Sequence, residues 1–389
     1  KLIIRNSYAL GNTNKTVSIV RAELILEGPL TIPQELAFLT SANSDVATAG
    51  AGLVAFRNAS GNNVIQGPIT LTSGAGSSEY VVDAGQLTLN GDISPDTTAR
   101  VLILSGAGPG IINGAVTNRD ANIPAVEKRG DGTWTLNAVN TYSGRTTVRG
   151  GTLALGPSAS IAASTPIEVQ TNATLNVAAV TGGFVLQSGQ TLMGEGTVVG
   201  NVTANGTVSP GASIGKLTFA NNLVLAGTTL MEIDRTNLPN ADLLVSASTT
   251  FGGALVVTNI GEELQLGDTF NLFDGPFTGT FAQIVLPPLP TGRGWDVSKL
   301  YVDGTIKVVV GVSTDPTSLS YFISGNALDI SWPSTHIGWT LLSQTNTLNV
   351  GLSSNWVPVP GSAATNRVIL PINPANGSVF LRLVYTNAP

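Results

Sequence analysis

The sequence predicts an all-β chain, with a β-solenoid over residues 1–311 and a small β-sandwich over residues 312–389. Three observations support this fold class. Short runs that alternate apolar and polar residues are separated by Gly, Asn or Asp, as in strands that bury one face and are joined by tight turns. A small motif centred on Thr recurs along the middle of the chain. Apolar residues at helical spacing never continue beyond about two turns.

The composition excludes several classes of protein. Charged residues make up only 11% of the chain, but the many β-branched residues argue against disorder, and the 45 Gly follow no triplet period, which excludes collagen. The absence of Cys excludes disulfides, thiolate metal sites and Cys nucleophiles. The net charge of −6 argues against nucleic acid as a partner. No apolar run is long enough for a transmembrane helix. Because the chain begins with Lys1 and not with Met, we expect that a signal peptide has been removed, with a start inside a longer chain as the alternative.

The first 126 residues read as short strands with tight turns. Leu2–Arg5 and Leu24–Leu26 are typical of these runs, and the second is apolar throughout, as expected of a strand that is covered on both sides. Asn90-Gly91 and Gly61-Asn62 mark turns between strands.

The middle of the chain carries the recurring motif, a small or polar residue followed by Thr and an apolar residue. The main copies are spaced by roughly 20 residues, which is the length of one solenoid coil. Each coil is expected to bury Val, Leu and Ile and to turn Thr, Asn and Ser toward solvent. The copies are Gly132-Thr133-Trp134, Gly151-Thr152-Leu153, Ala173-Thr174-Leu175, Gln190-Thr191-Leu192, Gly196-Thr197-Val198 and Gly206-Thr207-Val208.

The end of the solenoid and the last domain have their own signals. The segment Gly267–Phe281 holds four Phe in fifteen positions, which suggests a cap over residues 260–311 that shields the last coil. Gly311–Ser318 is rich in Ser, Thr, Asp and Pro and reads as a linker. Beyond it, six short strands with frequent turns predict the β-sandwich.

Residues 127–156 are the best copy of the repeat, and they resemble the passenger-associated transport repeat, also called the autotransporter-associated β-strand repeat. The resemblance implies a right-handed parallel β-helix in a secreted bacterial protein, and it brings no catalytic residues with it. The matching residues are Lys128, Gly130, Gly132, Thr133, Trp134, Thr135, Leu136, Asn140, Thr141, Tyr142, Gly144, Thr146, Val148, Gly150, Gly151, Thr152 and Leu153.

His336 is the only His, so a Ser-His-Asp triad would need it, together with Ser334 or Ser331 and Asp329. The segment Pro333–His336 reads as a turn, and we therefore expect a solvated loop histidine.

Carboxylates are sparse. A glycosidase or lyase would need two of them facing each other, and Asp120, Glu127 and Asp131 could meet on one face of the solenoid. Asp92 and Asp96 read as turn residues, as does Asp131-Gly132, and Glu262–Glu263 is a pair beside a turn. We expect surface and turn-capping roles for all of them.

Three other kinds of site have weak signals. A calcium-binding solenoid uses dense Asp-Gly repeats, whereas Gly130–Gly132 and Asp303-Gly304 are isolated. Trp332, Trp339 and Trp356 could stack on a carbohydrate, but core packing is the expected role. Glycosylation sequons, which arise by chance in a chain rich in Asn and Thr, begin at Asn14, Asn58, Asn172, Asn201, Asn205 and Asn376.

These observations predict no catalytic, cofactor-binding or metal-binding residue. The function expected first is a non-enzymatic structural protein, extracellular or on the bacterial surface, that self-assembles into a filament or layer. The apolar Lys1–Arg5 strand could pair with a neighbouring copy. An adhesin that binds glycan or a host surface and a polysaccharide-acting β-helix enzyme are the alternatives.

Overall fold

The computed structural model describes residues 1–42, 54–96, 99–313, 315–347 and 349–385. Within these ranges the regular elements are strands and two short 3₁₀-helices, η1 (Ser334–His336) and η2 (Ser362–Ala364). The chain divides into two compact units, one made of residues 1–262, 270–287 and 298–305, and the other of residues 263–269, 288–297 and 306–389. In the described residues, no helix is long and apolar enough to cross a membrane.

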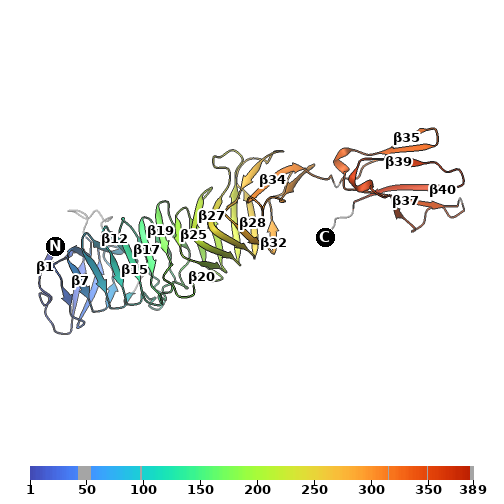
Figure 1. Cartoon of the computed structure of the whole chain (residues 1–389). Helices are drawn as coiled ribbons and strands as arrows, with labels where there is room; N and C mark the ends of the chain where they lie inside the picture. Colours follow the sequence, from blue (N-terminus) through green and yellow to red (C-terminus); the bar gives the residue numbers. More distant parts are fainter. Residues whose placement is uncertain (43–53, 97–98, 314, 348, 386–389) are drawn as a thin grey trace. The chain divides into compact units, whose positions relative to one another are not determined.

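The first unit is a parallel β-solenoid, as the sequence predicts (Figure 1). One sheet runs without branches through 13 strands, and successive strands in it come from successive coils. In order across the sheet, the strands are β1 (Leu2–Ile4), β3 (Leu24–Glu27), β6 (Phe56–Ser60), β9 (Ser77–Val82), β12 (Val101–Gly106), β14 (Ala125–Lys128), β16 (Thr146–Val148), β18 (Ile167–Val169), β21 (Thr191–Gly194), β24 (Thr207–Pro210), β26 (Thr228–Ile233), β28 (Ala254–Asn259) and β32 (Gln283–Val285).

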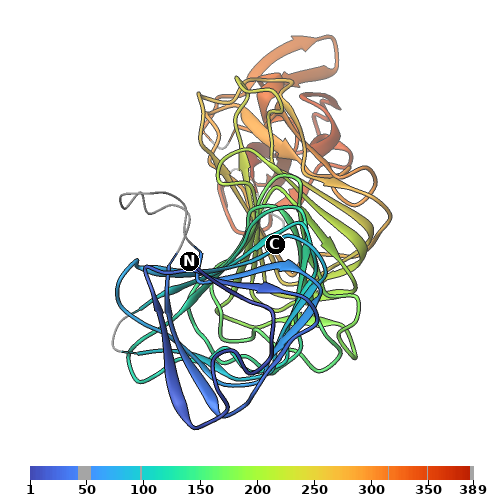
Figure 2. The ribbon, with the colours of Figure 1, turned by 90° about the vertical axis from the view of Figure 1, so that its left-hand side faces the viewer.

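Two further parallel sheets complete the coils, and the view from the N-terminal side shows successive coils lying over one another (Figure 2). A sheet of 14 strands contains β4 (Thr31–Ile32), β7 (Asn62–Ile65), β10 (Gln86–Leu89), β13 (Gly110–Ile112), β15 (Thr133–Leu136), β17 (Gly151–Leu155), β19 (Ala173–Asn176), β22 (Thr197–Val199), β25 (Lys216–Leu225), β23 (Val202–Ala204), β20 (Phe184–Leu186), β27 (Leu243–Phe251), β30 (Phe273–Asp274) and β31 (Phe277–Gly279). A sheet of four contains β2 (Lys15–Val20), β5 (Leu36–Ser41), β8 (Ile69–Leu71) and β11 (Ile93–Pro95).

The register explains the core. Because side chains alternate between the two faces of a strand, residues aligned in register form rows that are either inside or outside the solenoid. One inner row runs through Phe56, Tyr80 and Leu104, all buried. It continues through Lys128 and Val148, which are also buried.

The expectation that Asn, Thr and Ser face solvent is wrong at several positions. Asn58, Asn63 and Asn140 are buried, as are Thr40 and Thr146. The reason is that backbone donors at the corners need acceptors: the Asn63 side-chain oxygen accepts a hydrogen bond from the Leu30 backbone at 2.8 Å.

An aromatic cluster fills the end of the solenoid. The Phe251 ring centroid lies 5.0 Å from that of Phe273 and 4.7 Å from that of Phe281, and the rings of Phe277 and Tyr301 also pack against Phe251. A sheet of three strands, β29 (Thr269–Asn271), β34 (Thr305–Val310) and β33 (Arg293–Asp296), lies within the segment predicted as the cap.

The C-terminal residues form two antiparallel sheets of three strands each. One contains β35 (Ser320–Ser324), β36 (Ala327–Ser331) and β39 (Arg367–Pro371), and the other contains β38 (Val357–Pro358), β37 (Thr340–Asn346) and β40 (Ser378–Val384). They share one apolar cluster built on Ile330, Trp332, Leu341 and Val359. Closure into a sandwich, the domain boundary at residue 311 and the right-handed sense of the coils stay predictions.

Candidate functional site

The repeat coil begins with a buried lysine. Lys128 lies two residues after the inward-facing Val126 on β14, so it faces the interior and is 0% exposed. Its ammonium donates hydrogen bonds to the carbonyl oxygens of Arg129 at 2.6 Å, Gly130 at 2.8 Å and Gly150 at 3.1 Å. Burial lowers the pKa of Lys128 to about 8, and the nearby Asp131 carboxylate opposes this shift. The side chain thus joins the corner of its own coil to the next coil.

Trp134 fills the interior beside a glycine of the preceding coil. It is fully buried on β15, and its ring nitrogen donates to the Ser105 carbonyl at 3.1 Å. Gly110 is its register partner on β13. A Cβ atom at Gly110 would lie 2.3 Å from the Trp134 ring, so only glycine leaves room for the indole.

Asn140 ties three coils together. Its side-chain oxygen accepts a hydrogen bond from the Val116 backbone at 2.9 Å, and its amide donates to the carbonyl oxygens of Ala138 at 2.8 Å and Ser160 at 3.1 Å. Val116 precedes the repeat and Ser160 follows it. A buried side-chain amide can accept from a backbone N–H group and donate to backbone carbonyls at the same time, which makes it well suited to a solenoid corner.

A chain of buried hydroxyls links the repeat to the coil that follows. The Tyr142 hydroxyl lies 2.7 Å from that of Thr146, which lies 2.7 Å from that of Ser164, and Ser164 donates to the Gly144 carbonyl at 2.7 Å. Burial raises the pKa of Tyr142 to about 12, so this hydroxyl stays protonated at physiological pH. The side chains that give the repeat its sequence signature therefore stabilise the stack.

Two groups of carboxylates along the 13-stranded sheet are paired with arginines. Glu127 accepts a hydrogen bond from Arg149 at 2.7 Å and also pairs with Arg129. Arg57 bridges Glu23 at 2.6 Å and Asp83 at 2.8 Å in the same way near the N-terminus.

The structure does not bring Asp120, Glu127 and Asp131 together. Asp120 lies in a turn with a φ of 54°, and Glu127 is occupied by arginines. In the part of the chain that the structure describes, no three His, Asp or Glu residues gather as ligands for a metal ion. Asp92 accepts a hydrogen bond from the Ala115 backbone at 2.8 Å, and Asp96 accepts one from the Thr72 hydroxyl.

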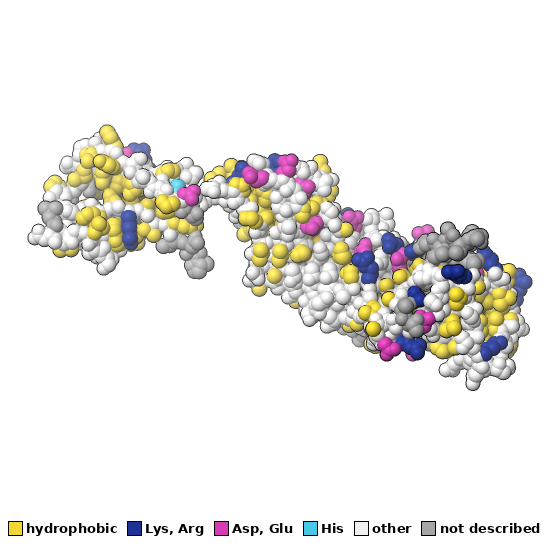
Figure 3. Space-filling view, turned by 180° about the vertical axis from the view of Figure 1, so that it is seen from behind, with side chains coloured by type: hydrophobic (Ala, Val, Ile, Leu, Met, Phe, Trp, Pro, Cys, Tyr) yellow, Lys and Arg dark blue, Asp and Glu magenta, His cyan; other side chains and the backbone are white. Residues whose placement is uncertain are grey.

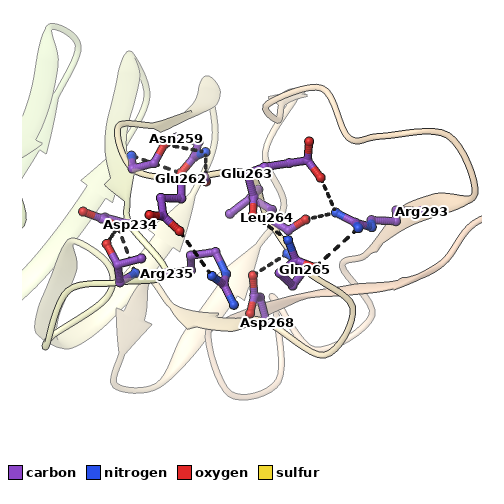
Figure 4. A network of polar contacts seen from close by, with 11 residues as sticks. Asp234, Arg235, Asn259, Glu262, Glu263, Leu264, Gln265, Asp268 and Arg293 are labelled. Atoms are coloured by element: carbon purple, nitrogen blue, oxygen red, sulfur yellow. Dashed lines mark hydrogen bonds and ion pairs between the residues drawn. The ribbon is translucent and has the colours of Figure 1, made fainter.

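Glu262 and Glu263 are adjacent in sequence but pair with different arginines (Figure 4). Glu262 lies 3.8 Å from Arg235, and Glu263 lies 3.1 Å from Arg293. This pair therefore provides no two facing carboxylates.

The expectation of a solvated His336 is wrong. This residue is only 5% exposed, because η1 folds it against the Trp339 ring at a centroid distance of 5.1 Å. One ring nitrogen lies 2.8 Å from the Asp315 carbonyl oxygen and the other lies 3.1 Å from the Thr335 hydroxyl. Asp329 is held by Arg367, so the histidine and the aspartate of the possible triad both have other partners.

The three C-terminal tryptophans do not form one platform. Trp332 and Trp339 are buried, and the Trp339 ring nitrogen donates to the Ser313 carbonyl at 2.7 Å. Trp356 is partly exposed, and the Arg382 guanidinium covers its ring at 4.2 Å.

The remaining candidates are local turn features. Asp303 accepts hydrogen bonds from the backbone and hydroxyl of Thr305, which closes a turn at Gly304. Among the sequon residues, Asn58 is buried and bonded on both ends of its amide, so the folded chain cannot be glycosylated there. Asn14, Asn172, Asn201, Asn205 and Asn376 are exposed.

Sequence reasoning missed a ladder of amide side chains along one solenoid corner. Asn90 donates to Gln66 at 2.7 Å, Asn113 to Asn90 at 2.8 Å and Asn137 to Asn113 at 2.7 Å. The signal was an amide residue every 23 or 24 positions. Ladders of this kind stabilise stacked parallel strands.

Comparison with known proteins agrees with the geometry. No curated protein matches the chain. The family pattern of the passenger-associated transport repeat matches residues 126–155, which span β14 to β17. The solenoid therefore contains a passenger-associated transport repeat at residues 126–155, and this repeat on a β-helix indicates a secreted passenger domain.

Proposed function

We propose that this chain is a non-enzymatic structural passenger outside the bacterial cell, and that its solenoids assemble end to end. One observation carries the non-enzymatic part of the proposal. The polar side chains of the repeat, Lys128, Asn140 and Tyr142, are buried and bonded between coils. Most of the acidic candidates also have partners: Glu127, Glu262, Glu263 and Asp329 pair with arginines, and Asp92, Asp96 and Asp303 accept hydrogen bonds. Side chains that are already hydrogen-bonded or ion-paired within the fold stabilise the scaffold and are not available to bind or activate a substrate.

The end-to-end part rests on the two outermost strands of the 13-stranded sheet. β1 pairs only with β3, and β32 only with β28, among the described residues. Leu2 is 52% exposed and Ile3 is 47% exposed, while Val285 on β32 is 42% exposed. Unpaired strand edges are templates for strand addition. Pairing of β32 of one copy with β1 of the next would continue the parallel sheet and cover these side chains.

Electron microscopy and sedimentation of the purified chain test this proposal. We expect particles that lengthen as protein concentration rises. Ile3→Lys places a charge on the β1 edge and should leave monomers or short particles. The control Val302→Lys changes an exposed valine of the same unit and should assemble normally. Monodisperse monomers at all concentrations would refute end-to-end assembly.

The two alternatives make different predictions. An adhesin should bind on a glycan array, and binding should be lost in Trp356→Ala, because Trp356 is the partly exposed tryptophan of the C-terminal sheets. An enzyme should release reducing ends from a polysaccharide, and Glu127→Gln should abolish that release.

A further inference from the structure

Strand β35 is an unusual surface element. Its three central side chains are large and apolar, yet Tyr321 is 74% exposed, Phe322 is 67% exposed and Ile323 is 55% exposed. The strand lies at the edge of its sheet, where it pairs only with β36 among the described residues. It carries no Lys, Pro or charged residue of the kind that normally protects a sheet edge. Hydrophobic side chains also gather on the surface of the C-terminal sheets in the space-filling view (Figure 3).

The hairpin geometry shows which backbone groups of β35 are free. Ser324 pairs with Ala327 across the two-residue turn Gly325-Asn326, and Gly325 has a φ of 57°. In such a hairpin the residues that flank the turn form a hydrogen-bonded pair, and the pairs alternate from there. Ser324, Phe322 and Ser320 therefore bond to β36. The amides and carbonyls of Tyr321 and Ile323 point to the open edge.

The inner face of this edge is also uncovered. Tyr321 is the register partner of Ile330, which is buried in the apolar cluster. Tyr321 therefore points toward the second sheet, but that sheet does not reach far enough to cover it. Instead it lines an open apolar pocket of about 290 Å³ together with Leu319, Leu328, Ile330 and Leu381.

We propose that β35 pairs antiparallel with β35 of a second copy, around a two-fold axis through Phe322. The segment Ser320–Ser324 reads Ser-Tyr-Phe-Ile-Ser, which is nearly symmetric about its centre. In this register Tyr321 faces Ile323 of the second copy, and Ser320 faces Ser324. The groups at the open edge then bond to each other, because Tyr321 and Ile323 exchange both of their backbone hydrogen bonds across the axis.

The side-chain pairing and the charges favour a second copy as the occupant. Aromatic residues opposite β-branched residues are favourable cross-strand pairs. No like charges meet, because β35 is uncharged, and Asp329 on the adjacent strand β36 is paired with Arg367 on β39. A two-fold interface uses the same patch on both partners, which a nearly symmetric strand satisfies.

The available area sets the strength of the contact. Since a buried aromatic side chain removes roughly 150–250 Å² from water, the three exposed side chains offer on the order of 400 Å² per copy. The total of about 800 Å² lies below the roughly 1,200 Å² at which specific stable interfaces begin, so the dimer is weak and reversible. This pairing is independent of end-to-end assembly of the solenoids, and Ile3→Lys leaves it intact.

Cysteine cross-linking tests the register directly, because the chain contains no Cys. In Phe322→Cys the two Cα atoms lie about 4.5 Å apart across the axis, which a disulfide can span. In the control Ser324→Cys they lie about 14 Å apart, which it cannot. We expect a disulfide-linked dimer from Phe322→Cys under air oxidation and at least about tenfold less from Ser324→Cys. Equal cross-linking of both variants, or of neither, overturns the proposed register.

Sedimentation of the Ile3→Lys chain tests the dimer without a cross-link. We expect a shift from monomer to dimer over about a hundredfold increase in concentration. Adding Phe322→Lys should abolish the shift without unfolding the chain, because this side chain is already exposed. Leu352→Lys, at a similarly exposed residue of the C-terminal sheets, should leave the shift unchanged. A monomer at all concentrations, or an equal loss in both variants, contradicts the proposal.

Discussion

The ammonium of Lys128 lies 3.1 Å from the carbonyl oxygen of Gly150, which belongs to the next coil of the solenoid. A charged group in the interior needs several acceptors, and the corner of the repeat coil supplies three backbone carbonyls. This one contact shows how the repeat works. Its most polar residue is used inside the fold, where it closes a corner and joins two coils.

Lys128→Met should destabilise the repeat coil while keeping its volume nearly constant. The variant leaves three carbonyls without their donor, and we expect a loss of about 2–4 kcal/mol in the free energy of unfolding. Lys216→Met, at an exposed lysine of β25, should change it by less than about 0.5 kcal/mol. Chemical denaturation of both variants measures the difference. Equal stability of the two variants would show that the carbonyl contacts contribute little.

Gly110→Ala should disrupt the packing of Trp134. The new Cβ would lie 2.3 Å from the ring, so the indole must move, at a cost of roughly 1–3 kcal/mol. Gly150→Ala is a matched control, since a Cβ there has no atom nearer than 3.6 Å and the residue has no positive φ. Thermal unfolding monitored by tryptophan fluorescence compares them. Trp134→Leu combined with Gly110→Ala should cost less than the sum of the single changes, and strict additivity would refute the steric explanation.

Asp242 should make stability depend on pH. This buried carboxylate accepts hydrogen bonds from the backbones of Gly215 at 2.8 Å and Glu232 at 2.7 Å, but burial raises its pKa to about 7. The folded state therefore holds a proton that the unfolded state releases near pH 4. Stability from this group is complete below about pH 4 and is lost as pH rises to about 7, by on the order of a few kcal/mol.

Asp242→Asn removes this titration. We expect the variant to be less stable than the wild type at pH 5 and the difference to shrink or reverse at pH 8, as measured by urea denaturation at each pH. A difference that stays constant across this range would mean that Asp242 does not titrate there.

Much of the solenoid could be predicted from sequence. The motif copies Gly132-Thr133-Trp134 and Gly151-Thr152-Leu153 lie at β15 and β17, because alternating apolar and polar residues bounded by Gly or Asn are a strong strand signal. The pattern could not predict which polar residues are buried in the core of the solenoid. Lys128 lies two residues after Val126 on the same strand and therefore faces inward, although lysine is almost never fully buried.

The C-terminal sheets were harder to predict in detail. The sequence predicts a strand over Ser320–Ser324, which is β35, but the exposure of this strand depends on how far the opposite sheet extends, which no local pattern encodes. His336 illustrates the same difficulty. Its turn-like setting suggested solvent, but the fold places Trp339 and the Asp315 carbonyl against it.

The central claim is that the repeat at residues 126–155 fastens coils to each other. Native-state hydrogen exchange of the wild type and Asn140→Ala tests it most directly, because Asn140 bonds to the coils before and after its own. We predict faster exchange in three successive coils, including the amide of Val116 in the coil before and that of Ser160 in the coil after, whose hydrogen bonds lie around this corner. Faster exchange confined to the substituted residue and its immediate neighbours in sequence would contradict the claim.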